Sequence, residues 1–402
     1  MTSSCDTAAA PGQDNAGAAG CPLAGPAFGS YAADDVTWLL KDLSGADLEA
    51  PTEEREAAVQ AGRAHYAESL PVEYLPSANY QELFNDALAR SAGKIAYAVG
   101  IVTDLVLAAR GPDAVLVSLA RAGTPVGVLM RRWAQHMHSL NLPHYAISIV
   151  RGRGIDHVAL AYIARHHDPA NVMFIDGWTG KGAITRELAA SIKDVNATLG
   201  TAFSSEMAVL ADTGSCVNIY GTRDDFLIPS ACLNSTVSGL VSRTVLNEDL
   251  IGPGDFHGAK FYAALAPVDV SRAFLAAVVA QFDTVADQVR VDVPVLVASD
   301  RTPQWTGWST VERLSKEYGI GSVNLVKPGV GETTRVMLRR VPWKVLVNPD
   351  AAEELSHILL LAEQRGVDVV EVPGLEYSCV GLIHPKFTRG ATGADGTALA
   401  PE

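Results

Sequence analysis

Residues Val172 to Thr185 read VMFIDGWTGKGAIT, and this stretch decides the fold that the sequence predicts. Four apolar residues run into Asp176, glycines follow in quick succession, and a helical pattern begins at about Ala183. This order predicts a buried strand, a tight glycine loop and the N-terminus of a helix. Backbone N–H groups in such a loop can surround a phosphate, and the helix dipole favours the anion. Because an acid at the strand end can hold ribose hydroxyls, the stretch predicts a site for a ribose phosphate.

The same alternation of strands and helices extends on both sides of this stretch. Ala114–Ala120 and His144–Val150 read as buried strands, and a helical pattern follows each of them. Strands that alternate with helices form parallel sheets, so we predict an α/β fold whose ligands bind beyond the carboxyl ends of the strands. The loops expected side by side at that edge are Arg121-Ala122-Gly123-Thr124, Arg151-Gly152-Arg153-Gly154 and Asp176 through Gly182.

The rest of the chain divides by composition. Residues 1–29 and 389–402 are rich in small and polar residues and are predicted to be disordered. Residues 52–67 and 79–109 have helical patterns, and Val36–Leu43 reads as a short helix or strand. A second α/β unit is predicted from about residue 322 onward.

Composition restricts the classes of function. The chain has 402 residues and a net charge of −14, which argues against nonspecific binding to nucleic acid or to anionic membranes. Five cysteines without metal-like spacing, and an N-terminus that does not read as a secretory signal, indicate a reducing cytoplasm. No apolar run approaches the length of a membrane span, so a membrane partner is not expected.

The segment Asp176–Gly182 resembles the signature loop of type I phosphoribosyltransferases, which bind phosphoribosyl pyrophosphate. That family usually has two acids before the Thr-Gly pair, whereas Gly177 stands at the second acidic position of this chain. The DGWTGKG form is similar to phosphoribosyltransferase-like proteins encoded beside tellurium-resistance (ter) gene clusters. Relatives with SYAADDVTWLL and LIPSACLNSTVSGLVSR are also labelled as the cysteine protease StiP family, and the resemblance covers about residues 30–388.

The resemblance implies phosphoribosyl transfer, a glycosyltransferase reaction, in the synthesis or salvage of a nucleoside-like metabolite. Its implied partner is phosphoribosyl pyrophosphate or a nucleotide-like ligand, with Mg²⁺ bound through the pyrophosphate, and a homo-oligomer is left open. Asp176 would hold the ribose hydroxyls, while Arg151 and Arg153 would neutralise the leaving pyrophosphate. No side chain is expected to bind a metal directly. The residues expected to bind phosphate groups are Arg121, Ala122, Gly123, Thr124, Gly177, Thr179, Gly180, Lys181 and Gly182.

The C-terminal unit resembles L7Ae/Pelota-like domains. Gly329-Val330-Gly331-Glu332 opens a helix and the strand Lys344–Val347 follows it. RNA binders of that family usually carry Asn before the Glu, and Gly331 takes that place, so we predict a substrate-covering or scaffold domain. The predicted division is a phosphoribosyltransferase-like domain over residues 30–290, with a helical N-terminal extension and a hood segment, and an L7Ae-like α/β domain over residues 291–388.

Three other functions stay open at this point. A cysteine hydrolase or protease would use Cys232, which follows Pro229-Ser230 in a polar turn, or Cys379, which lies in an apolar run. A Cys–His pair needs contact in space, which spacing along the chain does not show. The remaining alternatives are an RNA-binding protein and a noncatalytic protein that senses a ligand.

Overall fold

The computed structural model describes residues 20–50, 67–73, 75–76, 78–340 and 342–383. Most of the helix predicted over residues 52–67 lies outside the described residues, as do the C-terminal tail and residues 1–19. Residues 20–29 of the predicted N-terminal tail are described, and the backbone N–H of Leu23 donates to the carbonyl of Trp38 at 2.8 Å. The Phe28 side chain is buried in the core.

A mainly parallel sheet forms the centre of the molecule, as the sequence predicts. Its strand order is β1-β6-β5-β8-β9-β10, and β7 pairs with β6 in the antiparallel sense. The strands in chain order are β1 (Thr37–Trp38), β5 (Val115–Ala120), β6 (His144–Val150), β7 (Gly154–Ile155), β8 (Val172–Thr179), β9 (Met207–Asp212) and β10 (Ile219–Thr222). Strands β6, β5 and β8 are therefore neighbours, and their carboxyl ends meet at one edge.

Strand β8 is longer than the sequence pattern indicates. We predicted that the strand ends at Asp176, but it continues through Thr179 because Trp178 and Thr179 pair with Ala211 and Asp212 of β9. The glycine loop is therefore only Gly180–Gly182. The helix predicted from Ala183 begins there, as α5 (Ala183–Leu199).

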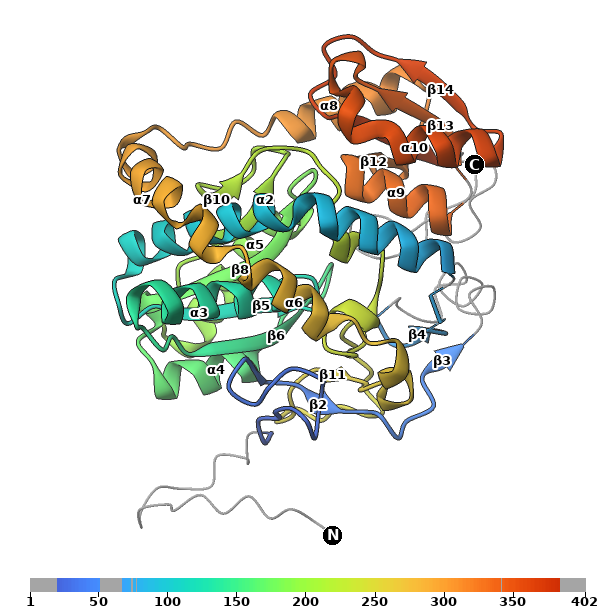
Figure 1. Ribbon diagram of the computed structural model, residues 1–402. Helices are drawn as coiled ribbons and strands as arrows, with labels where there is room; N and C mark the ends of the chain where they lie inside the picture. Colours follow the sequence, from blue (N-terminus) through green and yellow to red (C-terminus); the bar gives the residue numbers. More distant parts are fainter. Residues whose placement is uncertain (1–19, 51–66, 74, 77, 341, 384–402) are drawn as a thin grey trace, which may run out of the picture.

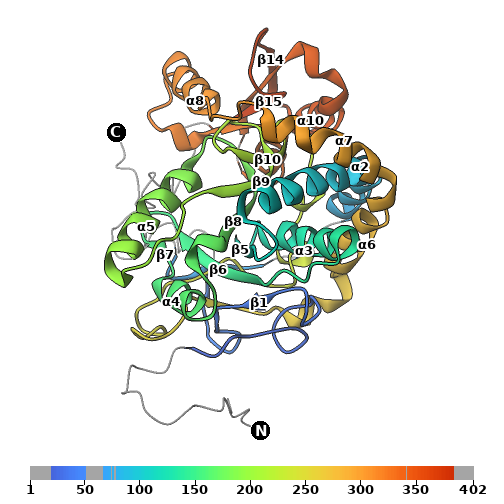
Figure 2. The same ribbon diagram turned by 90° about the vertical axis from the view of Figure 1, so that its left-hand side faces the viewer.

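Helices cover both faces of the sheet (Figure 2). One face carries α2 (Ala78–Arg110), α3 (Thr124–His138), α6 (Ser271–Val279) and α7 (Phe282–Ala298). The other carries α4 (His157–His166) and α5. Two apolar clusters fill the spaces between sheet and helices, one on each face. This three-layer arrangement is a mixed α/β fold with flanking helices.

Helix α2 corrects the expectation that no apolar run is long enough for a membrane. By length and composition alone it could cross one, but 56% of its most apolar window is buried inside the protein. It packs on α3, α7 and the strands β9 and β10. We interpret α2 as a core helix, because core helices of globular proteins have the same composition.

The C-terminal unit is a second α/β sheet, drawn in orange and red in Figure 1. Its strand order is β12-β15-β13-β14, with β15 antiparallel to both neighbours and β13 parallel to β14. The predicted division at residue 290 lies inside α7 and stays a prediction. The elements of the unit are α8 (Thr306–Glu317), β12 (Val326–Pro328), α9 (Val330–Arg339), β13 (Pro342–Val347), α10 (Ala352–Arg365), β14 (Asp368–Glu371) and β15 (Cys379–Ile383).

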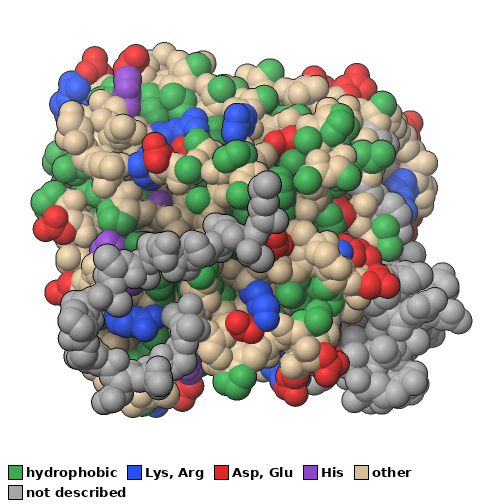
Figure 3. All heavy atoms as spheres, turned by 90° about the horizontal axis from the view of Figure 1, so that it is seen from below, with side chains coloured by type: hydrophobic (Ala, Val, Ile, Leu, Met, Phe, Trp, Pro, Cys, Tyr) green, Lys and Arg blue, Asp and Glu red, His purple; other side chains and the backbone are tan. Residues whose placement is uncertain are grey.

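Short strands and turns close the molecule opposite the C-terminal unit. Strand β2 (Lys41–Asp42) pairs with β11 (Gly258–Ala259), and β3 (Glu49–Ala50) pairs with β4 (Leu70–Pro71). Figure 3 views this end, where cationic and acidic side chains are interspersed without a broad area of one sign. The described surface at this end therefore presents no extended basic patch.

Candidate functional site

Two of the predicted loops are in direct backbone contact. The Arg121 loop follows β5 and packs on the end of β8, where a Cβ atom at Gly123 would lie 2.2 Å from the carbonyl oxygen of Ile175. Only glycine permits this approach, so the sequence places the start of α3 directly against Asp176. The Arg151 loop follows β6 on the other side of β5. The predicted meeting of the three strand ends is therefore confirmed.

Asp176 lies at this edge, and its carboxylate accepts a hydrogen bond from the backbone N–H of Gly177 at 2.7 Å. Burial raises the pKa of its carboxyl group to about 7, and the Gly177 N–H only partly opposes this effect. The carboxyl group therefore changes its protonation state close to neutral pH.

We expect Asp176→Asn to change how stability depends on pH. The folded pKa of Asp176 lies above the unfolded value of about 3.9, so the folded state holds an extra proton between pH 4 and 7. Wild-type stability contributed by this group is thus present below pH 4 and lost as pH rises through about 7. In urea unfolding, the free energy of unfolding of Asp176→Asn should rise relative to that of the wild type between pH 5 and pH 8. An equal difference at both pH values would contradict this account.

The three predicted arginines lie in different surroundings. Arg121 donates to the carbonyl of Val241 at 3.2 Å, and burial lowers its pKa. Arg151 is partly buried and lies close enough to Lys181 to lower the pKa of that lysine. Arg153 is exposed and forms ion pairs with Glu68 and Glu248 at 3.5 and 3.9 Å. Exposed pairs of this kind contribute little energy.

The glycine loop is covered by the C-terminal unit. The Tyr377 hydroxyl donates to the carbonyl of Gly180 at 2.9 Å, and Lys181 Nζ donates to the carbonyl of Val323 at 2.5 Å. Gly182 has φ +76°, and a Cβ atom there would lie 2.5 Å from the Trp305 ring and 2.8 Å from Cys216 Sγ. Side chains of the protein thus fill the space beside the loop. The predicted phosphate-binding role of these residues stays a prediction.

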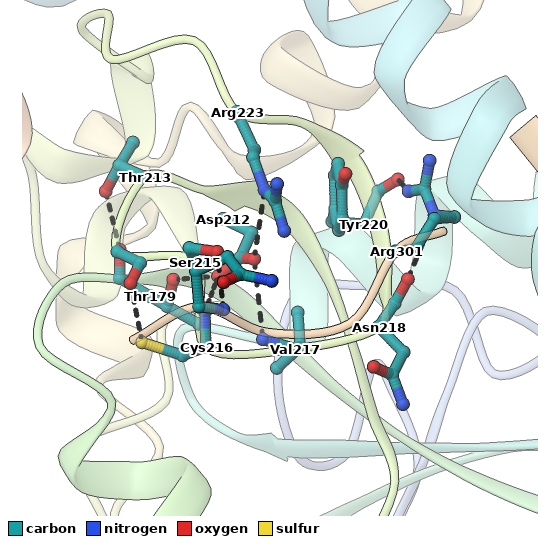
Figure 4. A network of polar contacts seen from close by, with 12 residues as sticks. Thr179, Asp212, Thr213, Ser215, Cys216, Val217, Asn218, Tyr220, Arg223 and Arg301 are labelled. Atoms are coloured by element: carbon teal, nitrogen blue, oxygen red, sulfur yellow. Dashed lines mark hydrogen bonds and ion pairs between the residues drawn. The ribbon is translucent and has the colours of Figure 1, made fainter. Parts of the chain in front are cut away.

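The turn that follows β9 is not among the sites that the sequence predicts. Asp212 is fully buried and accepts hydrogen bonds from the Thr179 hydroxyl at 2.5 Å and from the backbone N–H of Cys216 at 2.8 Å (Figure 4). Arg223 lies 3.6 Å from the same carboxylate, and the backbone N–H of Val217 lies 3.4 Å from it. One buried acid therefore fixes the turn that carries Cys216.

Cys216 has polar and charged neighbours. Its Sγ lies 3.2 Å from the carbonyl oxygen of Gly214. Burial raises the pKa of the thiol to about 12, with Asp212 as the next contribution, while a hydrogen bond with Thr179 and the charges of Arg186 and Arg223 lower it. The thiol also lies at the N-terminus of α5, because Gly182 caps that helix. A helix N-terminus and nearby guanidinium groups favour a thiolate.

The two cysteines that the sequence favoured belong to the core of the protein. Cys232 and Cys379 are both fully buried in the larger apolar cluster. Burial raises the pKa of the Cys379 thiol and the charge of Asp225 raises it further, while a hydrogen bond with Thr333 acts to lower it. The described interactions of Cys216 and Cys379 include no histidine. His144 bonds Ser118 at 2.7 Å, and His257 bonds Ser148 at 2.9 Å.

A small pocket lies at the junction of the two units. Its wall includes Trp178 of β8, Thr213 after β9, and Pro328 and Glu332 of the C-terminal unit. The Thr213 hydroxyl donates to the backbone carbonyl of Thr179 at 2.7 Å. This hydrogen bond connects the pocket wall to Thr179, the residue whose hydroxyl is hydrogen-bonded to Cys216.

Asp225 attaches the C-terminal unit to this pocket. Its carboxylate accepts from the backbone N–H groups of Val330 at 2.8 Å and Ser378 at 2.9 Å. Burial raises the pKa of Asp225 to about 6, and these N–H donors oppose the rise. Because Val330 begins α9, the acid caps that helix from the other unit. In the described residues, no group of three or more His, Cys, Asp or Glu side chains is placed to bind a metal ion.

Two family profiles match this chain. The profile described as "Tellurite-like stress resistance cysteine protease StiP" matches residues 29–279, and the profile described as "PELOTA RNA binding domain" matches residues 305–385. A curated relative named "Cysteine protease StiP", from Acinetobacter baylyi, is 33% identical over 376 residues. That alignment covers 90% of this chain and 95% of the relative.

These matches overturn the predicted phosphoribosyl transfer. The family and the relative are both named for proteolysis, so the predictions of a glycosyltransferase and of a phosphoribosyl pyrophosphate or nucleotide-like partner are wrong. The structure supplies a physical reason for the error. The loop that resembles the transferase signature has Gly177 in place of the second acid, and Tyr377 and Trp305 cover it. The matches favour the alternative of a cysteine protease, and residues 305–385 match a Pelota profile as the resemblance implied.

Proposed function

Because the chain belongs to the StiP family of cysteine proteases, we propose that it hydrolyses peptide bonds with Cys216 as the nucleophile. The observation that carries this assignment is the position of the thiol. Cys216 lies at a helix N-terminus and beside a hydroxyl, a carboxylate and two guanidinium groups. These are the groups that activate a thiol for nucleophilic attack.

Thr179 and Asp212 would remove the thiol proton. The Thr179 hydroxyl already donates to Asp212 at 2.5 Å and is hydrogen-bonded to Cys216. A proton can pass from sulfur to the Thr179 oxygen while the Thr179 proton passes to the carboxylate. The sulfur then bonds to the scissile carbonyl carbon, and the C–N bond breaks as the amine leaves with the proton from Asp212. Water then attacks the thioester carbonyl carbon, the C–S bond breaks, the acyl part leaves as a carboxylic acid, and a proton from the water restores the thiol.

The covered thiol in this structure is a latent form. Burial is the largest cause of the high pKa of Cys216, whereas Thr179, Arg186 and Arg223 all act to lower it. Removing the cover would let water in and would leave the groups that favour the thiolate in place. Opening of the segment around Trp305 would therefore both expose and activate the thiol.

The cover contacts the site through its backbone as well as its side chains. The backbone N–H of Trp305 donates to the carbonyl of Ser215 at 2.8 Å, and that of Gly307 donates to Gly214 at 3.1 Å. Trp305 itself has φ 56°, a left-handed conformation that is unfavourable for an aromatic residue. This conformation indicates that the surrounding contacts hold the segment in place.

We expect Trp305→Ala to accelerate alkylation of Cys216 by a small electrophile by roughly tenfold or more. Truncating a packed aromatic side chain costs several kcal/mol, which raises the open population. Peptide mapping by mass spectrometry would follow the Cys216 peptide separately from the other cysteines. Trp308→Ala is the matched control, because Trp308 also stacks on Arg186, at 3.9 Å, while Trp305 supplies the ring contact at Gly182. Equal rates in both variants would contradict the assigned cover.

The first test of the proposed function is turnover. The full chain should release fluorescent fragments from a labelled, unfolded protein substrate, and pretreatment with an alkylating reagent should abolish that release. No release by the wild type under any reducing condition would overturn the proposal.

We also propose a cytoplasmic role in resistance to tellurite-like stress, supported by the family description. The parallel sheet would then share only its scaffold with type I phosphoribosyltransferases.

A further inference from the structure

Residues 299–305, which we call the strap, join α7 to α8 (Figure 1) and contact the turn that carries Cys216. The backbone N–H of Trp305 donates to the carbonyl of Ser215, the residue directly before Cys216, at 2.8 Å. The backbone N–H of Gln304 donates to the Ser215 hydroxyl at 3.0 Å. Main-chain N–H groups of the strap therefore bind the turn in the way that a peptide ligand binds an exposed backbone.

The Trp305 ring lies beside the thiol. A Cβ atom at Gly182 would lie 2.5 Å from this ring and 2.8 Å from Cys216 Sγ, so the ring and the sulfur flank the same backbone position. The Arg186 guanidinium lies over the Trp305 ring, 4.9 Å from its centre. A guanidinium over an aromatic face is attracted to it. The structure thus has a place for an aromatic side chain next to the thiol.

Hydrogen bonds hold both ends of the strap. At one end Arg301 donates to the carbonyls of Asn218 at 3.0 Å and Tyr220 at 2.7 Å (Figure 4). At the other end the backbone N–H of Gly307, in the first turn of α8, donates to a carbonyl of the turn at 3.1 Å. Between them, Trp305 is only partly buried and belongs to none of the apolar clusters of the described residues. Its ring can therefore be displaced without unpacking a cluster, and the ring of another chain can take its place.

We propose that the strap mimics the substrate, and that the preferred substrates are peptides with an aromatic residue in the place of Trp305. This inference rests on the proposed function, in which Cys216 is the nucleophile. The N–H of the substrate's aromatic residue would donate to the Ser215 carbonyl, and its ring would contact Gly182 and the Arg186 guanidinium. Because Ser215 directly precedes the nucleophile and a peptide residue spans about 3.5 Å, the cleaved bond would lie next to the aromatic residue.

Binding to an inactive, uncovered protein tests this inference separately from catalysis. The double variant Cys216→Ser, Trp305→Ala would be titrated with labelled peptides that differ only by Trp, Leu or Ala at one central position. The Trp peptide should bind more tightly than the Leu peptide, and at least about tenfold more tightly than the Ala peptide, a difference of 1.4 kcal/mol. Equal binding of the three peptides would overturn the inference.

The single variant Cys216→Ser tests whether the strap and the peptide share one place. Its own Trp305 competes at the high effective concentration of a tethered group, so the Trp peptide should bind at least about tenfold more weakly than it binds the double variant. Cys216→Ser with Trp308→Ala is the matched control, because Trp308 also stacks on Arg186 but leaves Trp305 in place. Equal affinity for the single and the double variant would contradict the mimicry.

A substitution of Arg186 tests how the aromatic ring is recognised. In the double variant, Arg186→Gln should bring the Trp-to-Leu affinity ratio toward one, because the guanidinium favours an aromatic ring over an aliphatic side chain. Arg313→Gln is the control, since Arg313 is a half-exposed arginine that pairs with Glu317 on α8, and it should leave the ratio unchanged. An unchanged ratio in Arg186→Gln would remove the guanidinium from the proposed site.

Cleavage by the wild type keeps the inference testable if the double variant does not fold. kcat/KM should be at least about tenfold higher for the Trp peptide than for the Ala peptide. If the two peptides are cleaved equally well, the inference fails and the proposed function stands. If the Trp peptide binds the double variant selectively, but neither the wild type nor Trp305→Ala cleaves any peptide, the proposed function alone fails.

Discussion

Cys216→Ser is expected to lower kcat/KM for peptide hydrolysis by at least about a thousandfold, because a catalytic nucleophile contributes several powers of ten. A serine hydroxyl fits the same space and can keep the hydrogen bond to the carbonyl of Gly214. The variant should therefore fold with nearly the stability of the wild type. Initial rates on a fluorogenic peptide, with thermal unfolding of the same samples, would check both expectations.

The control for this result is substitution of the two apolar cysteines. Cys232→Ala and Cys379→Ala remove fully buried thiols from the larger apolar cluster. They should lower stability by about 1 kcal/mol, as small core truncations do, and retain most of the activity. If either variant loses activity as completely as Cys216→Ser while remaining folded, that cysteine is the nucleophile and the assignment of Cys216 is wrong.

Asp212→Ala is expected to destabilise the protein by about 3 kcal/mol and to abolish turnover. Its carboxylate accepts from Thr179 and from the backbone N–H groups of Cys216 and Val217, and removing it leaves these donors buried without an acceptor. The turn that carries the thiol would then lose its fixed geometry. Urea unfolding monitored by tryptophan fluorescence measures the stability change.

Asp212→Asn separates the structural role of this residue from its chemical role. An amide oxygen can still accept from Thr179 and from the Cys216 N–H, so the variant should lose less stability than Asp212→Ala. An amide cannot take a proton, so kcat should still fall by roughly a hundredfold or more. Activity close to wild type in this variant would remove Asp212 from the proposed proton transfer while leaving its structural role intact.

The fold followed from local patterns in the chain. The apolar runs at Val115–Ala120 and His144–Val150 and the helical pattern from Ala183 all form the predicted elements. Because the strands are parallel, their carboxyl ends were predicted to meet at one edge of the sheet. The contact of Gly123 with Ile175 confirms this prediction. Such features depend on side-chain periodicity and on backbone connectivity, which a single sequence displays.

The candidate site depended on contacts that a single sequence does not display. Tyr377 bonds Gly180 across 197 positions of the chain. Asp212 and Cys216 lie close together in the sequence, but their neighbours Thr179 and Arg186 come from β8 and α5. The extension of β8 through Thr179 likewise comes from pairing with β9. The sequence therefore predicts a site at the glycine loop, but it does not show that Cys216 lies against this loop.

The error in predicted chemistry has the same origin. A glycine loop at a helix N-terminus favours any negative group, whether it is a bound phosphate or a protein thiolate. The sequence shows the loop but not its occupant. In this structure Cys216 Sγ lies at that helix N-terminus, and Trp305 lies over it. The same local physics therefore supports a different reaction.

The most direct test of the account locates the covalent intermediate. The wild type would be mixed with a peptide ester, quenched in acid within one turnover, digested and mapped by mass spectrometry. We predict the acyl mass on the peptide that contains Cys216, and its absence from the peptides that contain Cys232 and Cys379. An acyl group on another cysteine, or turnover without any acylated cysteine, would contradict the assignment of Cys216 as the nucleophile.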